Sequence, residues 1–556
     1  MSVMSNKVYK SLVYDDGTMY DMLQKASKKY PNNIAYSFMG KKQTYQGFVN
    51  EVDKAAKSLV SLGVKEDEIV CIAMPNVPQA IIFLYAVNKI GAIANMIHPL
   101  SSQEEMLTFI NRVNSKTILI MDQFYDSIKN IRKDTKLVNV IVASVSEKLP
   151  FYKILPYKLT TGKNIKKIDS SERIIRFNDF LKLGNSVKEL PKIEDHTNKV
   201  SLILHSGGTT GKIKGVCLSN KSVNAATKQI KEANPKFEQG NRMLTVMPIF
   251  HGNGLIIGVH AMLCYGVECV LIPRFSPESY AKDMVKNKCN YISGVPTLYG
   301  KMIEVKYIQN KDLSFLKGVY CGADSLSIEL EDRINNFLHE HGCKVSIRQG
   351  YGMTEGVVVS TLNPDGKEKP GSIGMPLSDV DIKIVKPGTT EELPTNEVGE
   401  IVFSSITNMS GYYKDDEETN ITLVKHDNGK TYVHSGDLGS IDEEGYIYFK
   451  GRIKRMIVTN GYNVFPLELE SILETHEFVE RACVLGIPDK ERIEKVVAFI
   501  VLKSEIEKSD ETKQILVQHC KNHIAKYALP RDIVFIDELP KTKVGKVDYN
   551  KIIKSY

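Results

Sequence analysis

A segment rich in glycine and hydroxyl residues, LHSGGTTGKIKGVCLSN (204–220), carries the strongest chemical signal in the sequence. An apolar run leads into a loop that holds Ser206, Thr209 and Thr210 among glycines, and two lysines follow. Glycines let backbone N–H groups converge on an anion without obstruction by Cβ, while hydroxyls add donors and lysines add positive charge. These residue types in this order predict a loop that holds phosphate.

The Walker A loop is the obvious alternative, and its pattern is G-x-x-x-x-G-K-[ST]. Aligning its Gly-Lys pair on residues 211–212 places Ser206 where the first glycine belongs and Ile213 where the magnesium-binding hydroxyl belongs. Both required positions are therefore occupied by the wrong residue type. The sequence excludes a Walker A loop at this site.

The segment instead resembles the phosphate loop of the adenylate-forming superfamily, which comprises acyl-CoA synthetases, adenylation domains of peptide synthetases, and luciferases. The family pattern is approximately [ST]-[SG]-G-[ST]-T-G-x-P-K-G. It is matched by Ser206, Gly207, Gly208, Thr209, Thr210, Gly211, Lys214 and Gly215. Ile213 replaces the usual proline, which removes no hydrogen-bond donor.

Further motifs of this superfamily follow in the same order along the chain. They are MPIFHGNG (247–254), VYCGAD (319–324), RQGYGMTEG (348–356), HSGDLG (434–439), GRIKRMIVTNGYNVFPLELE (451–470) and PKTKVGKVDYNK (540–551). The resemblance thus covers nearly the whole chain and is least constrained over residues 145–196. It implies activation of a carboxylic acid with ATP, in which the carboxylate attacks the α-phosphorus and pyrophosphate leaves.

The resemblance implies catalytic roles for individual residues. Lys546 would bridge the attacking carboxylate and the α-phosphate, and Thr354 would contact the α-phosphate. Thr210 and Glu355 would be the magnesium-associated pair, a hydroxyl and a carboxylate of the hard-oxygen type that Mg²⁺ prefers. His251 would gate the acyl pocket.

The resemblance also implies residues that bind ATP and CoA. The loop at 206–214 would hold the β- and γ-phosphates, and Asp437 and Arg452 would bind the ribose. Adenine binding would fall to Gly322, Gln349, Gly350 and Tyr351. Lys454 would be the hinge of a mobile C-terminal domain, and Gly461 would line the pantetheine tunnel. Arg274 lies where some relatives bind the CoA 3′-phosphate, although a structural surface arginine is an equal interpretation.

The elements that must position these residues alternate between helix and strand periodicity. We expect helices at 46–62 and 77–91, strands at 68–74, 117–121, 137–144 and 200–205, and continued alternation to about residue 350. This alternation is typical of doubly wound parallel sheets. From residue 371 to 404 the period becomes two, as in a β-barrel or sandwich. After residue 451 we expect helices at 466–475 and 511–526 and strands at 481–487, 495–502 and 532–536.

We therefore predict an α/β protein with two domains, because 556 residues exceed what one hydrophobic core supports. Residues 1–452 would form an AMP-binding domain of two doubly wound α/β subdomains plus a β-barrel subdomain. Residues 453–556 would form a small, mobile α+β domain.

Composition excludes several function classes. The net charge of +7 is dispersed over 60 lysines and 13 arginines, so nucleic acid is not an expected partner. The nine cysteines lack zinc spacing. No secretory signal is visible, and the uncharged run 243–267 is broken by Pro248, so we expect a cytoplasmic protein without a transmembrane segment.

The aromatic cluster at 149–159 is either a packed surface insertion or a contact for a membrane or partner.

The expected activity is a two-step acid–thiol ligation with ATP, Mg²⁺ and CoA. The implied acyl pocket contains Gly252, Asn253, Gly254, Ile257 and residues 357–359, which are mostly small or apolar, and no nearby aspartate is evident to hold an ammonium. This favours a medium- or long-chain fatty acid, with an aryl or arylpropenoic acid as the alternative. Loading of a carrier protein stays open as the second acceptor. A non-enzymatic nucleotide sensor would lack Lys546 or Glu355, and both are present.

Overall fold

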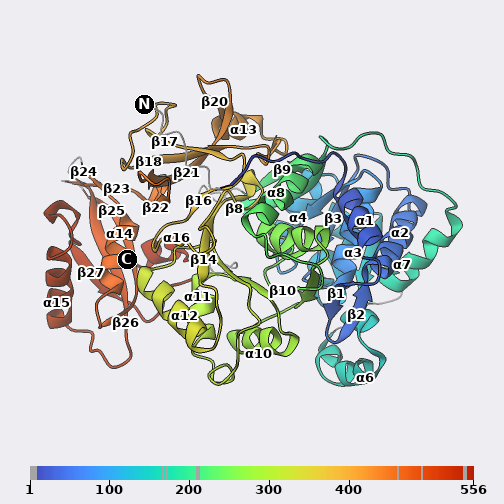
Figure 1. Ribbon diagram of the computed structural model, residues 1–556, viewed down its shortest axis with the longest axis horizontal. Coiled ribbons are helices and arrows are strands. Elements are labelled where there is room, and N and C mark those ends of the chain that lie inside the picture. The colour runs from blue at the N-terminus through green and yellow to red at the C-terminus, as the bar shows by residue number, and fades with distance from the viewer. Residues whose placement is uncertain are drawn as a thin grey trace.

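The computed structural model describes residues 9–165, 168, 173–207, 213–459, 462–489, 492–541 and 547–556. In this part of the chain, two large mixed sheets, a smaller antiparallel sheet and a separate C-terminal sheet carry the fold. The C-terminal sheet lies at one end of the long axis, and the N-terminal α/β layers lie at the other (Figure 1).

The first large sheet has the strand order β19-β9-β8-β4-β3-β5-β6-β7 and is parallel from β8 to β7. Its strands are β3 (Ile69–Ala73), β4 (Ile93–Met96), β5 (Thr117–Met121), β6 (Asn139–Ala143), β7 (Ile175–Arg176), β8 (Val200–Gly207), β9 (Ile213–Ser219) and β19 (Gly411–Tyr412). The helices between them are α3 (Pro78–Lys89), α4 (Gln103–Arg112), α5 (Asp126–Lys129), α6 (Phe151–Leu159) and α7 (Phe177–Leu183), and α8 (Asn220–Ala233) follows β9. The expected alternation over this region is confirmed.

The second large sheet has the order β16-β15-β14-β13-β12-β10-β11-β1-β2. Its strands are β1 (Ile34–Phe38), β2 (Lys41–Thr44), β10 (Arg242–Thr245), β11 (Glu268–Leu271), β12 (Tyr291–Gly294), β13 (Gly318–Cys321), β14 (Ile347–Tyr351), β15 (Thr361–Leu362) and β16 (Met375–Pro376). The associated helices are α1 (Met19–Lys29), α2 (Tyr45–Ser61), α10 (Pro277–Asn287), α11 (Pro296–Met302) and α12 (Ile328–Glu340). The hairpin β1–β2 joins this sheet by parallel pairing with β11, so both sheets share one hydrophobic core.

The uncharged run 243–267 folds inside the protein. It contains all of β10 except Arg242, a π-helix at Asn253–Ala261 and the short helix α9 (Met262–Cys264). A Cβ at Gly254 would lie 2.2 Å from the carbonyl oxygens of Met247 and Pro248, so only glycine fits this close approach. No helix in the described part of the chain is both long and apolar enough to cross a membrane.

The smaller sheet corrects one expectation. Its strands are β17 (Asp381–Val385), β18 (Gly399–Ser404), β20 (Leu423–Lys425), β21 (Thr431–Ile441) and β22 (Ile447–Arg452), and α13 (Asp416–Thr422) precedes β20. All pairings are antiparallel, but β20 and β22 pair with successive parts of the long strand β21. These pairings do not close the sheet into the expected β-barrel, because period-two alternation is common to barrels and open sheets and does not encode closure.

The C-terminal sheet has the order β24-β23-β26-β25, and β27 pairs with β26. Its elements are β23 (Ile457–Thr459), β24 (Tyr462–Val464), α14 (Pro466–Glu474), β25 (Val479–Asp489), β26 (Ile493–Leu502), α15 (Asp510–Lys521), β27 (Asp532–Phe535) and α16 (Tyr549–Ser555). Its two hydrophobic clusters draw buried residues only from 457–552. The predicted boundary at 452–453 falls directly after β22, whereas mobility about it stays a prediction.

Candidate active site

The hairpin of β8 and β9 presents both ends of the predicted phosphate loop. Ser206 and Lys214 are register partners in this hairpin, and Gly207 pairs with Ile213. Gly208, Thr209 and Thr210 lie outside the described residues. The structure therefore shows that the two strand ends on either side of the predicted phosphate loop are paired with each other.

A buried carboxylate lies beside the β8 end of this hairpin. Glu355 is 4% exposed and belongs to the 3₁₀ turn Thr354–Gly356, next to the half-buried Thr354. Its Oε1 accepts hydrogen bonds from Ser206 Oγ at 3.1 Å and from Tyr412 Oη at 2.9 Å. Burial, with the charge of Glu355 as a lesser cause, raises the pKa of Tyr412, so its hydroxyl remains a donor. Three segments distant in sequence thus meet at one carboxylate.

Lys214 is held by residues that follow this tyrosine. Its ammonium forms an ion pair with Glu418 of α13 and lies 5.0 Å from the centre of the Tyr412 ring. Asp415, which caps α13, pairs with Arg112 at 3.7 Å. The anchoring of Lys214 by Glu418 was not predicted, although the acidic run at 415–418 after two tyrosines was its visible signal.

A second buried carboxylate brings together three predicted nucleotide-binding residues. Asp437 is 4% exposed, and Tyr351 Oη donates to its Oδ2 at 2.9 Å. Arg452 Nε lies 3.3 Å from Asp437 Oδ1, because Asp437 of β21 and Arg452 of β22 are opposite each other in register. Burial and the charge of Asp437 raise the pKa of Tyr351 well above its ordinary value.

The other predicted adenine-binding residues lie at the carboxyl ends of β13 and β14. These parallel strands approach closely, since a Cβ at Gly322 would lie 3.0 Å from the carbonyl oxygen of Gly350. Gln349 is 5% exposed, and its buried Oε1 has no hydrogen-bond partner among the described residues. A crevice at the carboxyl ends of parallel strands is the usual ligand position in open α/β sheets.

The turn after Glu355 carries backbone strain. Val357 and Val358 have φ angles of +52° and +82°, in the left-handed region that β-branched residues rarely occupy. A Cβ at Gly252 would lie 2.2 Å from Val358 Cγ2, so the two predicted acyl-pocket segments meet here. Such strain costs about 1–3 kcal/mol per residue and persists only where the surroundings impose it, commonly at functional sites.

Gly352 leaves room for this strained turn. Replacing Gly352 by alanine tests whether the turn requires a glycine there. In Gly352→Ala the new Cβ would lie 2.1 Å from the carbonyl oxygen of Val358, which is backbone and cannot rotate away. We expect the midpoint of thermal unfolding to fall by at least about 3 °C. Gly300→Ala is the matched control, because its Cβ would approach Leu330 Cδ1 only to 3.4 Å. If both variants lowered the midpoint of thermal unfolding equally, the strained turn would not require glycine at position 352.

His251 directly precedes the glycine that touches Val358. Its ring lies 4.8 Å from the ring of Phe250, which in turn lies 4.3 Å from that of His98. The backbone oxygen of His251 accepts from Leu255 N at 3.0 Å, an α-helical bond at the entrance to the π-helical segment. The predicted gate is therefore placed beside the acyl-pocket segments, together with His98, which sequence reasoning missed.

Two described residues among those predicted, Arg274 and Lys454, make no contact with this site that the structure shows. Arg274 is exposed in the segment after β11, and Lys454 is exposed in the turn Ile453–Arg455. Gly461 and Lys546 lie outside the described residues.

Arg455, next to the predicted hinge, is a further residue that sequence reasoning missed. Its guanidinium donates to Glu470 Oε1 at 2.5 Å and to Tyr549 Oη at 3.0 Å, and it lies 4.1 Å from the Tyr549 ring. Burial raises the pKa of Tyr549 to about 12, and the charge of Asp324 is a minor cause. Arg455 thus ties the turn at the predicted hinge to α14 and α16 of the C-terminal domain.

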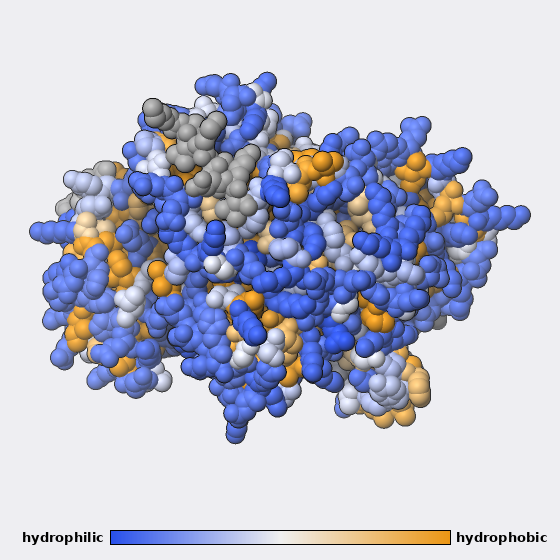
Figure 2. Space-filling view, in the orientation of Figure 1, coloured by the Kyte–Doolittle hydropathy of each residue, from blue (hydrophilic) through white to orange (hydrophobic). Residues whose placement is uncertain are grey.

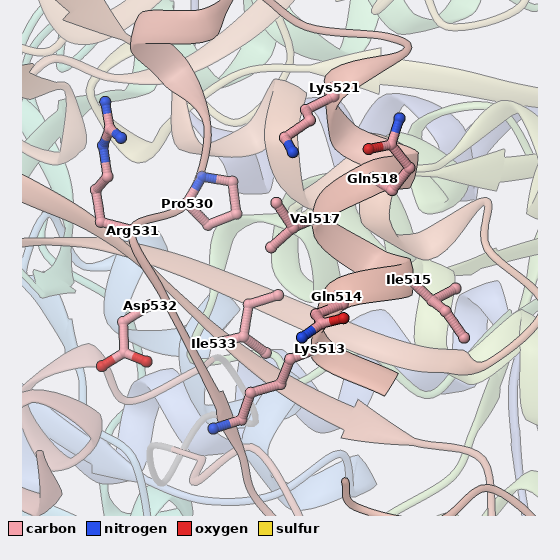
Figure 3. Close-up of a pocket in the computed structure, with 10 residues that line it drawn as sticks. All are labelled: Lys513, Gln514, Ile515, Val517, Gln518, Lys521, Pro530, Arg531, Asp532 and Ile533. Carbon is pink, nitrogen blue, oxygen red and sulfur yellow. The ribbon is translucent and has the colours of Figure 1, made fainter. Parts of the chain in front are cut away.

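A surface hollow of about 730 Å³ lies elsewhere, between α15 and the start of β27 (Figure 3). It is lined by Lys513, Gln514, Ile515, Val517, Gln518, Lys521, Pro530, Arg531, Asp532 and Ile533. None of the predicted site residues lines it. The two buried carboxylates, not this hollow, mark the candidate active site.

Comparison with known proteins agrees with this geometry. The AMP-binding enzyme family model matches residues 23–413, and the model of the AMP-binding enzyme C-terminal domain matches residues 468–546. The chain therefore belongs to the AMP-binding enzyme family. Within this family it groups with the acyl-CoA synthetases of the adenylate-forming superfamily.

Two curated relatives and one solved structure illustrate the likeness. The long-chain-fatty-acid–CoA ligase of Bacillus subtilis (strain 168) is 30% identical over 99% of this chain and 96% of its own length. The probable 4-coumarate–CoA ligase 3 of Dictyostelium discoideum is 30% identical over 89% of this chain and 87% of its own. The crystal structure of the anthranilate CoA ligase AuaEII with anthranoyl-AMP shares the fold, with a TM-score of 0.81 and 24% identity over 97% of each chain.

Proposed function

We propose that this enzyme joins a carboxylic acid to CoA in two steps. The acid and ATP first give an acyl-AMP and pyrophosphate, and the thiol of CoA then displaces AMP to give the thioester. The observation that carries the proposal is a pair of buried carboxylates in a chain of this family: Glu355 beside the predicted phosphate hairpin, and Asp437 hydrogen-bonded to Tyr351.

The first step needs ATP held in line with the attacking carboxylate. Asp437 would accept hydrogen bonds from both ribose hydroxyls, and the carboxyl ends of β13 and β14 would hold adenine. Residues 206–214 would hold the departing phosphates. Catalysis of phosphoryl transfer consists mainly of such positioning and of neutralising charge on phosphoryl oxygens.

The residues at Glu355 fit a magnesium ion. Both hydrogen bonds that this carboxylate accepts from Ser206 and Tyr412 go to Oε1, so Oε2 would serve as the hard-oxygen ligand. Thr210 would supply the paired hydroxyl. When bound, Mg²⁺ would neutralise negative charge on the phosphates. Ser206 and Tyr412 would keep the carboxylate in place.

Replacing Tyr412 by Phe tests this positioning role. The substitution removes one hydrogen bond to Glu355 and keeps the ring beside Lys214. Because a hydrogen bond to a charged group contributes about 1.5–3 kcal/mol, we expect acid-dependent pyrophosphate release to slow about tenfold. The Mg²⁺ concentration at half-maximal rate should rise as well. An unchanged rate and Mg²⁺ dependence would show that Glu355 does not need this bond.

The second step would use another pose of the C-terminal domain. Rotation about Lys454 would withdraw Lys546 and bring Gly461 to the pantetheine path, where a missing Cβ admits a thin chain. Arg274, exposed after β11, would bind the CoA 3′-phosphate.

The acid that we favour is a medium- or long-chain fatty acid. The predicted pocket segments meet at Gly252 and Val358, and Ile257 lies on the adjoining π-helix, so an apolar tail is the expected occupant. The likeness to a long-chain-fatty-acid–CoA ligase over nearly the whole chain supports this choice. The likeness to a probable 4-coumarate–CoA ligase supports an arylpropenoic acid as the second candidate.

A panel of acids distinguishes the two candidates. Pyrophosphate release is measured with ATP, Mg²⁺ and CoA across saturated fatty acids of increasing length, 4-coumarate, benzoate and amino acids. We expect kcat/KM to rise with chain length, since each buried methylene contributes about 0.8 kcal/mol. A preference for 4-coumarate over every fatty acid would instead establish the second candidate.

A further inference from the structure

Helix α6, in the insertion between β6 and β7, exposes an apolar face. The exposed fractions of Phe151, Leu155 and Leu159 are 86%, 65% and 65%, and that of Tyr152 is 58%. Figure 2 shows orange, hydrophobic atoms on the projection at the lower right, where Figure 1 places α6. Because soluble surfaces rarely gather several large apolar side chains, this patch indicates an interaction surface.

The exposure follows from how α6 is attached to the protein. Ile154 and Tyr157, three residues apart, pack against the main hydrophobic core. The exposed residues 151, 155 and 159 are spaced by four and therefore share another face of the helix. Lys153 Nζ donates to the carbonyl oxygen of Met39 at 2.7 Å, which fixes α6 to the turn of the β1–β2 hairpin. The helix is anchored on one face and directs its apolar stripe outward.

Positive charge surrounds the apolar stripe. Residues 149–165 contain three lysines, Lys153, Lys158 and Lys163, and neither aspartate nor glutamate. Among them Lys158 and Lys163 are exposed, and Lys41 and Lys42 are exposed on the neighbouring hairpin. The face is therefore complementary to a surface that is apolar inside and anionic outside.

We propose that α6 docks this face onto a lipid bilayer that contains anionic phospholipid. Phe151, Leu155 and Leu159 enter the boundary between headgroups and acyl chains, and the lysines contact the phosphates. A short amphipathic helix with apolar and cationic sides lies in the interface, and nine residues are too few to span the bilayer. Each lysine near an anionic surface strengthens this binding. This inference does not require the proposed substrate, although a long-chain acid would partition into the same bilayer.

Co-sedimentation of the full-length protein with vesicles tests the proposal. The vesicles are phosphatidylcholine alone or phosphatidylcholine with roughly one third phosphatidylglycerol. We expect binding to the anionic vesicles at least about tenfold tighter, weakening as salt is raised. The variant Phe151→Asp/Leu155→Asp should lose at least about tenfold of this binding. Val138→Asp, at a site 66% exposed, is the matched control and should bind like the parent.

Two further readouts distinguish lipid binding from misfolding and from self-association. ATP-dependent activation of a short, water-soluble acid should be equal in the parent and the double variant, which establishes that the variant is folded. Absence of binding by the parent, or equal binding by the double variant, would overturn the proposal. Self-association of the parent that is lost in the double variant, without vesicle binding, would assign the face to a second copy instead.

Discussion

Lys546→Ala is expected to raise the activation free energy of acyl-AMP formation by about 3 kcal/mol, which slows this step roughly 150-fold. The proposed role of Lys546 is to place a point charge between the attacking carboxylate and the α-phosphate, and a long flexible stem suits such delivery. The alanine variant lacks that positive charge, which in the parent would offset the negative charge that builds on the phosphoryl oxygens in the transition state. Thioester formation from supplied acyl-AMP should largely survive, because phosphorus is no longer the reaction centre.

The two half-reactions can be measured separately. Acid-dependent exchange of pyrophosphate into ATP reports the first, and conversion of synthetic acyl-AMP and CoA to the thioester reports the second. Lys541→Ala is the control, since this exposed lysine lies five residues away at a variable position of the P-x-x-x-x-G-K motif. Equal losses in both half-reactions would remove Lys546 from the proposed role.

Glu355→Gln is expected to reduce acyl-AMP formation by about 100- to 1000-fold, the scale for loss of one strong electrostatic contribution in an active site. Glutamine has nearly the same shape, and its amide oxygen can still accept from Ser206 and Tyr412. The substitution therefore removes the negative charge while preserving the local fold. Since that charge is proposed to bind Mg²⁺, the residual activity should need more Mg²⁺ to saturate.

The control for this variant is another buried glutamate. Glu331 of α12 is 2% exposed and receives a backbone hydrogen bond from Gly371 at 3.4 Å, so Glu331→Gln tests whether loss of any buried carboxylate is damaging. Initial rates of pyrophosphate release are compared over a range of Mg²⁺ concentrations. If Glu355→Gln kept the parent's Mg²⁺ dependence, Glu355 would not be the metal-associated carboxylate.

The hydrophobic periodicity of the sequence predicted individual helices and strands well, but it did not predict which strands pair with each other. The helix expected at 46–62 is α2 at Tyr45–Ser61, and the strand expected at 117–121 is β5 at those residues. The pairing of β1 with β11 was not predicted, because it joins residues more than two hundred positions apart and leaves no local pattern. Likewise, alternation in the smaller sheet could not show that β21 pairs with β20 and β22 along one edge.

The same limit applies to the site. Motifs named Ser206, Glu355 and Asp437, and the structure places Ser206 against Glu355 and buries both carboxylates. Motifs did not name Tyr412, whose hydroxyl completes the contacts of Glu355, because that role depends on the approach of β19 to β9. The strain at Val357 and Val358 also escaped prediction, since valine gives no local signal for a positive φ.

The most direct test of the proposed ligase activity is product analysis by mass spectrometry. The purified protein is incubated with ATP, Mg²⁺, CoA and a mixed pool of fatty, aryl and amino acids. We predict AMP, pyrophosphate and a fatty acyl-CoA, which would establish the ligase and name its acid. Acyl-AMP and pyrophosphate without any thioester would indicate loading of a carrier protein, and ADP with inorganic phosphate would contradict adenylation altogether.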